Sequence, residues 1–68
     1  MDDLDAQYPI LAFFKFEHLP EPLQAVSRPF GELARHLAEK LPRNAETSAG
    51  LRKLLEAKDC AVRSALTR

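Results

Sequence analysis

The chain has 68 residues, 46% of them hydrophobic, and its ten basic residues balance its ten acidic ones. A chain of this length buries only about 60% of the surface that its unfolded form exposes, so its fold needs further stabilisation. The single cysteine, Cys60, excludes a disulfide within the chain, and the distant His18 and His36 lack the spacing of a structural zinc site. Self-association is the remaining means of stabilising the fold.

The zero net charge argues against binding to DNA or to an anionic membrane, although a basic surface is expected locally near the C-terminus. No segment is long and apolar enough to span a membrane. The acidic beginning, with Asp2, Asp3 and Asp5, lacks the basic residues of a signal peptide. Because a lone thiol also fits a reducing compartment, we expect a cytoplasmic protein.

The first residues are polar and acidic apart from Leu4 and Tyr8, and we interpret residues 1–12 as a flexible acidic leader ahead of one domain, residues 13–68. The most apolar stretch, ILAFFKFEHLP, spans residues 10–20. A short apolar run is typical of a strand or of an extended arm, and no second strand is indicated elsewhere. We expect an arm or a short helical turn that covers a helix face or a neighbouring subunit.

Apolar residues at steps of three and four predict a helix from about Pro20 to Leu41. These residues are Leu23, Val26, Phe30, Leu33, Leu37 and Leu41. Pro29 removes one hydrogen bond inside this helix, which predicts a kink near Ser27–Arg28. Pro42 is expected to end the helix.

A second helix is predicted from about Ala45 to the C-terminus, with Asn44 as its N-cap. Its apolar residues cover more than half of the circumference near the C-terminus, so it needs a partner besides the first helix. A second copy of the chain is the simplest such partner, and we expect Val62 and Leu66 in that interface. The sequence thus predicts an all-α fold. A kinked helix and a long helix form a hairpin with an N-terminal arm, assembled as a homo-oligomer.

No catalytic pattern is present, and we expect neither enzymatic activity nor a cofactor or metal. The two glycines, Gly31 and Gly50, lie in helical patterns and form no phosphate-binding loop. Cys60 with His36 would resemble a nucleophile and its base. However, Cys60 lies among alanines and a valine on a helix, where a buried, inert thiol is the ordinary case.

Two features indicate ligand binding. The stretch FFKF, residues 13–16, puts three aromatic rings beside a cation, an arrangement that stacks nucleobases but is also common in hydrophobic arms. Arg28 at the predicted kink and Arg63 near the end of the last helix carry guanidinium groups, which bind phosphate oxygens. For Arg28, an ordinary surface side chain is the alternative.

The segment AGLRKLLEAKDCAVRSAL, residues 49–66, resembles the last helix of the phage anti-CBASS sponge proteins, whose helical hairpin is shared with sponges that oppose the Thoeris defence. The residues that fit are Leu51, Arg52, Lys53, Leu54, Glu56, Ala57, Val62 and Arg63. Upstream, residues 16–19, a Pro/Glu helix start, then Arg28, Gly31 and Ala34 resemble the family's first helix. The resemblance covers residues 14–66 through short motifs. Just ahead of the first helix, this chain has a phenylalanine where the family often has a tyrosine. The phenylalanine could still stack on a base but could not make the hydrogen bond of the tyrosine hydroxyl.

This resemblance implies a non-catalytic sponge that sequesters cyclic nucleotide second messengers in the host cytoplasm and so blocks anti-phage signalling. It also implies a compact homo-oligomer, such as a hexamer, with pockets between subunits. We predict that Phe16, with Phe14 as its substitute, stacks a base, and that Arg28 and Arg63 hold phosphates in a shared pocket. The alternative is a small helical protein–protein interaction module that inhibits a host protein.

Overall fold

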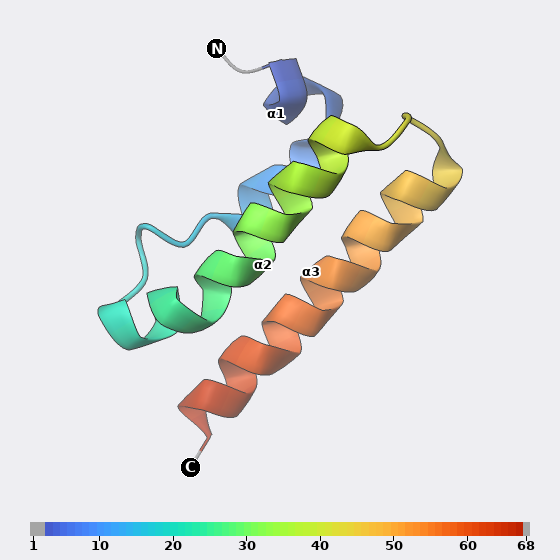
Figure 1. Cartoon of the computed structure of the whole chain (residues 1–68). Helices are drawn as coiled ribbons and strands as arrows, with labels where there is room; N and C mark the ends of the chain where they lie inside the picture. Colours follow the sequence, from blue (N-terminus) through green and yellow to red (C-terminus); the bar gives the residue numbers. More distant parts are fainter. Residues whose placement is uncertain (1–2, 68) are drawn as a thin grey trace.

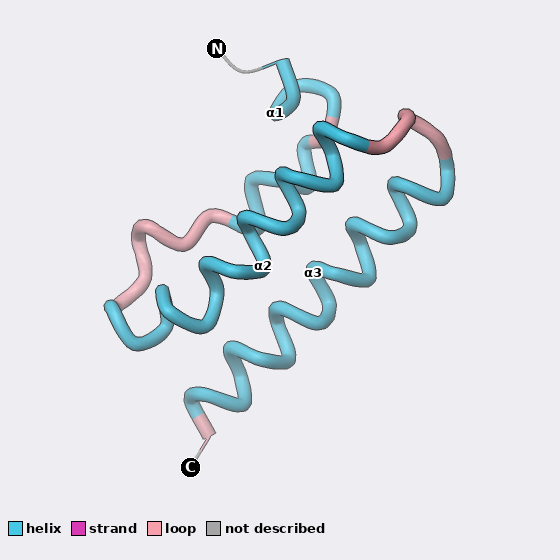
Figure 2. Tube along the Cα trace, viewed as in Figure 1, coloured by secondary structure: helices cyan, strands magenta, loops and turns pink. Residues whose placement is uncertain are grey.

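Two long helices form an antiparallel hairpin in the computed structural model, which describes residues 3–67 (Figure 1). The elements in chain order are the helix α1 (Asp3–Gln7), the 3-10 helix η1 (Pro9–Phe14), and the helices α2 (Glu21–Lys40) and α3 (Ala45–Leu66). None of residues 3–67 lies in a strand, and the loops link the helices, apart from a short stretch after α3 (Figure 2). The predicted all-α hairpin is therefore confirmed.

The bounds of both long helices agree with the sequence pattern. The helix expected over Pro20–Leu41 is observed as Glu21–Lys40, and the one expected from Ala45 begins there. Pro29 lies inside α2, which continues through it, so the kink at Ser27–Arg28 stays a prediction. Among the described residues, no helix has the length and apolarity needed to cross a membrane.

Asn44 caps α3, as its position in the sequence predicted. Its Oδ1 accepts a hydrogen bond of 2.9 Å from the backbone N–H of Thr47, and the Thr47 hydroxyl donates one of 2.7 Å to the carbonyl of Pro42. These two bonds satisfy polar groups that the start of a helix leaves without partners. They also fix the turn after Leu41, and thereby the angle at which α3 returns along α2.

The N-terminal segment contributes half of the hydrophobic core. The buried core residues are Tyr8, Leu11 and Phe14 from this segment, Ala34 and Ala38 from α2, and Leu51 from α3. The interpretation of residues 1–12 as a flexible leader is therefore wrong for residues 3–12; residues 1 and 2, like residue 68, lie outside the described part. The expected domain boundary after residue 12 divides η1, which packs against both long helices.

The apolar surface on two sides of α3 has a partner within the chain. One side packs on α2, and η1 packs against the other, where Ile10 and Phe13 line a hollow together with Leu55. Val62, which we expected in an interface with another copy, is partly buried in the chain and lines a hollow beside Phe13. Leu66 is exposed. The two-sided pattern was recognised correctly, but η1 takes much of the place assigned to a second copy.

A glycine allows the N-terminal segment to lie close to α2. A Cβ atom added at Gly31 would be 2.9 Å from the backbone oxygen of Phe14 and 3.3 Å from the ring of Phe16. Ser27, Ala34 and Ala38, which are also small, are the buried residues of the same helix. Small side chains on α2 therefore set how closely the rest of the chain approaches it.

We expect Asn44→Ala to lower the free energy of unfolding by about 1 kcal/mol, because it removes the cap that accepts from Thr47. For a chain of this size, this corresponds to a decrease of about 4–8 °C in Tm, measured by circular dichroism. Arg43→Ala, in the same turn but outside the cap, is the control and should change Tm little. Equal effects of the two substitutions would contradict the role of the cap.

The two glycines should respond in opposite directions to alanine. Gly31→Ala should destabilise the fold, since the new Cβ would collide with the Phe14 backbone. Gly50→Ala places its Cβ in open space on α3, and should raise the free energy of unfolding by about 0.5–1 kcal/mol. Urea denaturation of both variants measures the difference, and a stabilising Gly31→Ala would show that the close approach is not needed.

Candidate ligand-binding groove

The structure does not bring the four predicted ligand-binding residues into one pocket. Phe14 is only 3% exposed and belongs to the core, so its predicted role as a substitute stacking residue is wrong. Phe16 and Arg28 lie together on the α2 side of the N-terminal segment, whereas Arg63 lines a separate hollow beside η1 and α3. Phe14 is therefore a core residue, Phe16 and Arg28 form an aromatic–cation pair, and Arg63 lies apart from all three.

Phe16 and Arg28 form a cation–π contact within the chain. The guanidinium carbon of Arg28 lies 4.9 Å from the centre of the Phe16 ring. The ring is half-buried beside Gly31, and the arginine is exposed. The contact engages the face of the ring that a base would need, so within one chain this pair is an internal contact rather than a formed ligand site.

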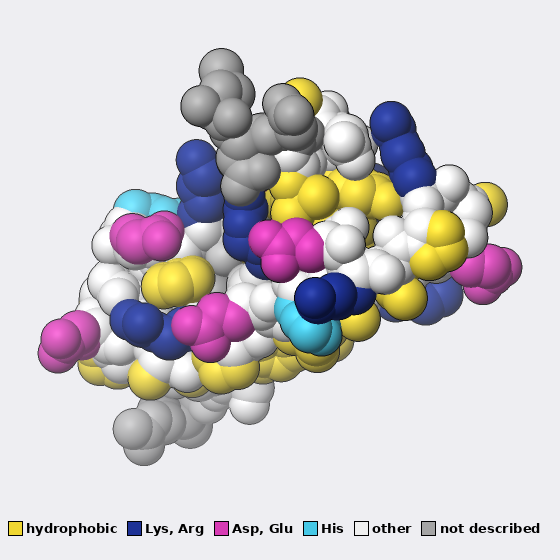
Figure 3. Space-filling view, turned by 45° about the horizontal axis from the view of Figure 1, so that its top comes forward, with side chains coloured by type: hydrophobic (Ala, Val, Ile, Leu, Met, Phe, Trp, Pro, Cys, Tyr) yellow, Lys and Arg dark blue, Asp and Glu magenta, His cyan; other side chains and the backbone are white. Residues whose placement is uncertain are grey.

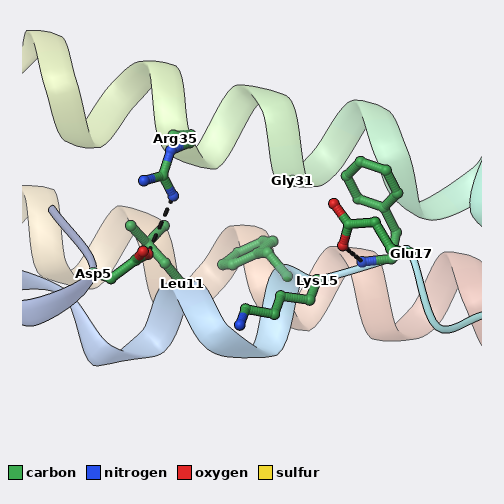
Figure 4. A pocket seen from close by; sticks show the side chains of 8 residues that line it. Asp5, Leu11, Lys15, Glu17, Gly31 and Arg35 are labelled. Atoms are coloured by element: carbon green, nitrogen blue, oxygen red, sulfur yellow. Dashed lines mark hydrogen bonds and ion pairs between the residues drawn. The ribbon is translucent and has the colours of Figure 1, made fainter. Parts of the chain in front are cut away.

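A hollow of 310 Å³ adjoins Phe16 (Figure 4). At one end of this hollow, Arg35 forms an ion pair with Asp5, with 3.2 Å between Nη1 and Oδ1. At the other end lies Glu17, whose Oε1 accepts a hydrogen bond of 3.3 Å from the backbone N–H of Phe16. Its two carboxylates balance the charges of Arg35 and of Lys15, which also lines it, so this hollow has no excess of positive charge to hold a phosphate.

Arg63 belongs to a second hollow of 330 Å³, which we call the C-terminal groove. It lies between the end of η1, the loop that follows, and the last turns of α3. Its lining consists of Ala12, Phe13, Lys15, His18, Leu19, Lys58, Asp59, Val62 and Arg63. The ring of Phe13 is 67% exposed, which makes it the most exposed large hydrophobic side chain among the described residues. An accessible aromatic face thus lies beside basic side chains.

The charge of the C-terminal groove is predominantly positive. Lys58 belongs to α3, and only 13% of its side chain is exposed. Its ammonium group pairs with the Asp59 carboxylate at 3.2 Å. Lys15 and Arg63 add two further cations. Arg63 also donates a hydrogen bond of 3.5 Å to the sulfur of Cys60. One carboxylate facing these basic groups leaves the groove suited to an anion.

The loop that carries Lys15 and His18 is anchored to the start of α2. The Gln24 side chain donates hydrogen bonds to the Leu19 carbonyl at 2.8 Å and to the Glu17 carbonyl at 3.1 Å. Both bonds restrain the loop where it enters the helix. The backbone that carries Lys15 and His18 is therefore held in place, which reduces the conformational entropy lost when a ligand binds.

The groove continues along α3 toward its N-terminal half. Phe13 also lines an adjoining hollow of 330 Å³ with Arg52 and Leu55. Arg52 and Arg63 are eleven residues apart, which is about three helical turns, so both lie on one side of α3 about 16 Å apart. An exposed aromatic ring between two arginines is the arrangement that a flat ligand with separated negative groups would fit.

Of the three rings in the FFKF stretch, Phe13 is exposed, Phe16 is half-buried and Phe14 is buried. Leu4, Tyr8, Leu11 and Phe14 are spaced by four, three and three residues, which is a helical pattern that places Phe14 inside. The same spacing directs Phe13 outward. This signal was present in the sequence, but the segment was interpreted as a leader followed by an arm.

Cys60 also differs from its prediction, because its side chain is exposed rather than buried. His36 lies exposed on α2. Within residues 3–67, no three His, Cys, Asp or Glu side chains are grouped in a way that would hold a metal ion.

No protein-family model, curated protein or solved structure matches this chain.

The contact between Arg28 and Phe16 should appear as a coupling energy. In a double-mutant cycle of Arg28→Ala and Phe16→Leu, we expect coupling of about 0.5–1 kcal/mol in the free energy of unfolding. A cycle of Arg43→Ala with Phe16→Leu is the control, and its effects should be additive. Additivity in both cycles, measured by urea denaturation, would contradict the contact.

Proposed function

We propose that this protein is a non-catalytic binding protein that sequesters a small nucleotide in its C-terminal groove. The observation that carries the proposal is the exposed ring of Phe13 beside the cations of Lys15 and Arg63. Base stacking on an aromatic ring contributes about 1–3 kcal/mol, and a guanidinium group binds phosphate oxygens through paired hydrogen bonds. Sequestration requires tight binding and no turnover, which agrees with a site built from stacking and ionic groups.

The finer form of the proposal names a cyclic nucleotide messenger, following the resemblance to the phage sponges. In that form, the protein acts in the host cytoplasm and lowers the concentration of the messenger below what the immune effector needs. The site differs from the one predicted from the sequence. Phe13 replaces Phe14 and Phe16 as the stacking residue, Arg63 is kept, and Lys15 takes the place of Arg28.

Assembly of several copies, such as a hexamer, is also part of the proposal. The sequence predicted a pocket shared between subunits. The C-terminal groove places one exposed ring beside basic side chains within a single chain, so ligand binding in this form does not depend on assembly.

A protein–protein interaction module is the second candidate, and a specific observation favours it. Leu33 and Leu41 are each 44% exposed on the hairpin. Exposed leucines on a helix are typical of a surface that receives another helix. Under this alternative, the chain would inhibit a host protein by covering it, and nucleotides would not bind.

Calorimetric titration tests the ligand site. A thermal-shift screen with cyclic dinucleotides, cyclic trinucleotides and cyclic ADP-ribose isomers selects the probe, because a ligand at a hundred times its Kd stabilises the fold by about 2.7 kcal/mol. Arg63→Ala should then weaken binding by about ten- to a hundredfold, since a charge-assisted hydrogen bond contributes on the order of 1.5–3 kcal/mol. Phe13→Ala should weaken it similarly through lost stacking.

Arg43→Ala, an exposed cation in the turn at the other end of the hairpin, is the matched control and should bind as the unmodified chain does. Arg28→Ala should also leave affinity unchanged, because Arg28 lies with Phe16 outside the groove. Loss of affinity in Arg28→Ala but not in Arg63→Ala would move the site to Phe16. Absence of binding to every compound in the screen would overturn the proposed function.

A further inference from the structure

The space between η1 and α3 extends well beyond the C-terminal groove. Two further hollows, of 330 Å³ and 320 Å³, follow it toward the start of α3, and because Arg52 lines both of them we call them the Arg52 hollows. Phe13 lines the C-terminal groove and the first of these hollows, so all three adjoin one another. On α3, their lining residues are Ser48, Arg52, Leu55, Lys58, Asp59, Val62 and Arg63. From Ser48 to Arg63 this is a stretch of about 22 Å along one side of the helix.

Arg52 carries a positive charge that no neighbouring group in its hollows balances. The other residues that line the Arg52 hollows are all neutral: Gln7, Tyr8, Pro9, Ile10, Phe13, Ser48 and Leu55. Arg52 is exposed and, within residues 3–67, takes part in no ion pair or hydrogen bond. By contrast, Arg35 pairs with Asp5, and on the face shown in Figure 3 most basic side chains lie beside acidic ones. The Arg52 hollows are therefore a second place along this seam that is suited to an anion.

The exposed ring of Phe13 lies between the two cationic ends, because it lines the hollow of Arg52 on one side and that of Arg63 on the other. The Arg63 guanidinium bonds to the sulfur of Cys60, so it leans toward the start of α3, as long side chains on a helix do. Arg52 lines its second hollow together with Ser48, one turn earlier, and leans the same way. The two guanidinium groups therefore stay about as far apart as their backbones, about 16 Å.

A cation on each side of a stacking ring discriminates between two arrangements of phosphates. A nucleotide within a phosphodiester chain or ring carries one phosphate on its 5′ oxygen and another on its 3′ oxygen, on either side of its sugar. With its base stacked on Phe13, one phosphate can reach Arg63 while the other reaches Arg52. The two phosphates of a pyrophosphate share an oxygen and lie together, so they engage one end of the seam and leave the other empty.

We propose that Arg52 forms a second anion-binding site, and that the nucleotide stacked on Phe13 bears a phosphate at both its 5′ and its 3′ position. This inference rests on the proposed function and narrows its ligand class. Phosphodiester-linked oligonucleotides, including cyclic dinucleotides and trinucleotides, fit both sites. Cyclic ADP-ribose isomers, which are joined by a pyrophosphate, fit only one.

Titration with adenosine 3′,5′-bisphosphate and with ADP tests the second site, because these probes share a base and a number of phosphates and differ in where the phosphates lie. The unmodified chain should bind the bisphosphate at least about tenfold more tightly, through the added charge-assisted hydrogen bonds to Arg52. Arg52→Ala should abolish this preference by weakening the bisphosphate alone. Arg52 is exposed, so the variant should keep the helical circular dichroism spectrum. Lys53→Ala removes the next cation on α3, which is exposed and lines none of the three hollows, and this matched control should keep the preference.

The cyclic compounds repeat the comparison on larger ligands. Arg52→Ala should weaken binding of the best cyclic oligonucleotide by about tenfold or more and leave that of a cyclic ADP-ribose isomer unchanged.

The second site can fail while the proposed function stands. Three results would overturn it: equal affinity of the unmodified chain for the bisphosphate and ADP, an Arg52→Ala variant that keeps its preference or weakens both probes equally, or tighter binding of a cyclic ADP-ribose isomer than of every cyclic oligonucleotide. In each case the chain still binds a nucleotide, and Arg63→Ala should still weaken that binding. If the unmodified chain binds none of these compounds, both proposals fail together.

Discussion

The close approach of the N-terminal segment to α2 at Gly31 is the contact on which the other features of this protein depend. The Phe14 backbone lies against the helix where any side chain would intrude, and its ring enters the core. With Phe14 fixed inside, its neighbour Phe13 must point outward, and Phe16 is carried to the side of Arg28. The position of one backbone carbonyl therefore determines which aromatic ring is offered to solvent and which is used internally.

The same contact divides the hairpin into two unlike faces. On one face, η1 covers the seam between the long helices and forms a basic groove with α3. A hairpin of two amphipathic helices has too little core to be stable alone, and here the third layer is supplied by a segment of only six residues. The proposed ligand site follows from this asymmetry, since it lies on the face that η1 covers.

Much of the fold was predictable from the sequence because its signals are local. Proline positions, the Asn44 cap and the spacing of leucines predicted both ends of α2 and the start of α3 to within a residue, whereas α3 ends at Leu66 and not at the C-terminus. The N-terminal segment was misinterpreted, since its apolar residues are diluted by acidic ones and their helical spacing is visible only across residues 4–14. The groove was not predictable in this way. It depends on Lys15 and Arg63 meeting from distant parts of the chain, which only tertiary packing determines.

A core built from both ends of the chain also constrains how the protein is made. Phe14 leaves the ribosome first, yet it packs in one core with Leu51, 37 residues later in the sequence. At synthesis rates of about 5–20 residues per second, that interval is about two to seven seconds. During this time, an apolar aromatic segment has no hairpin to pack against. The hairpin core therefore forms only after α3 has been synthesised, and until then the segment around Phe14 exposes apolar side chains of the kind that holding chaperones bind.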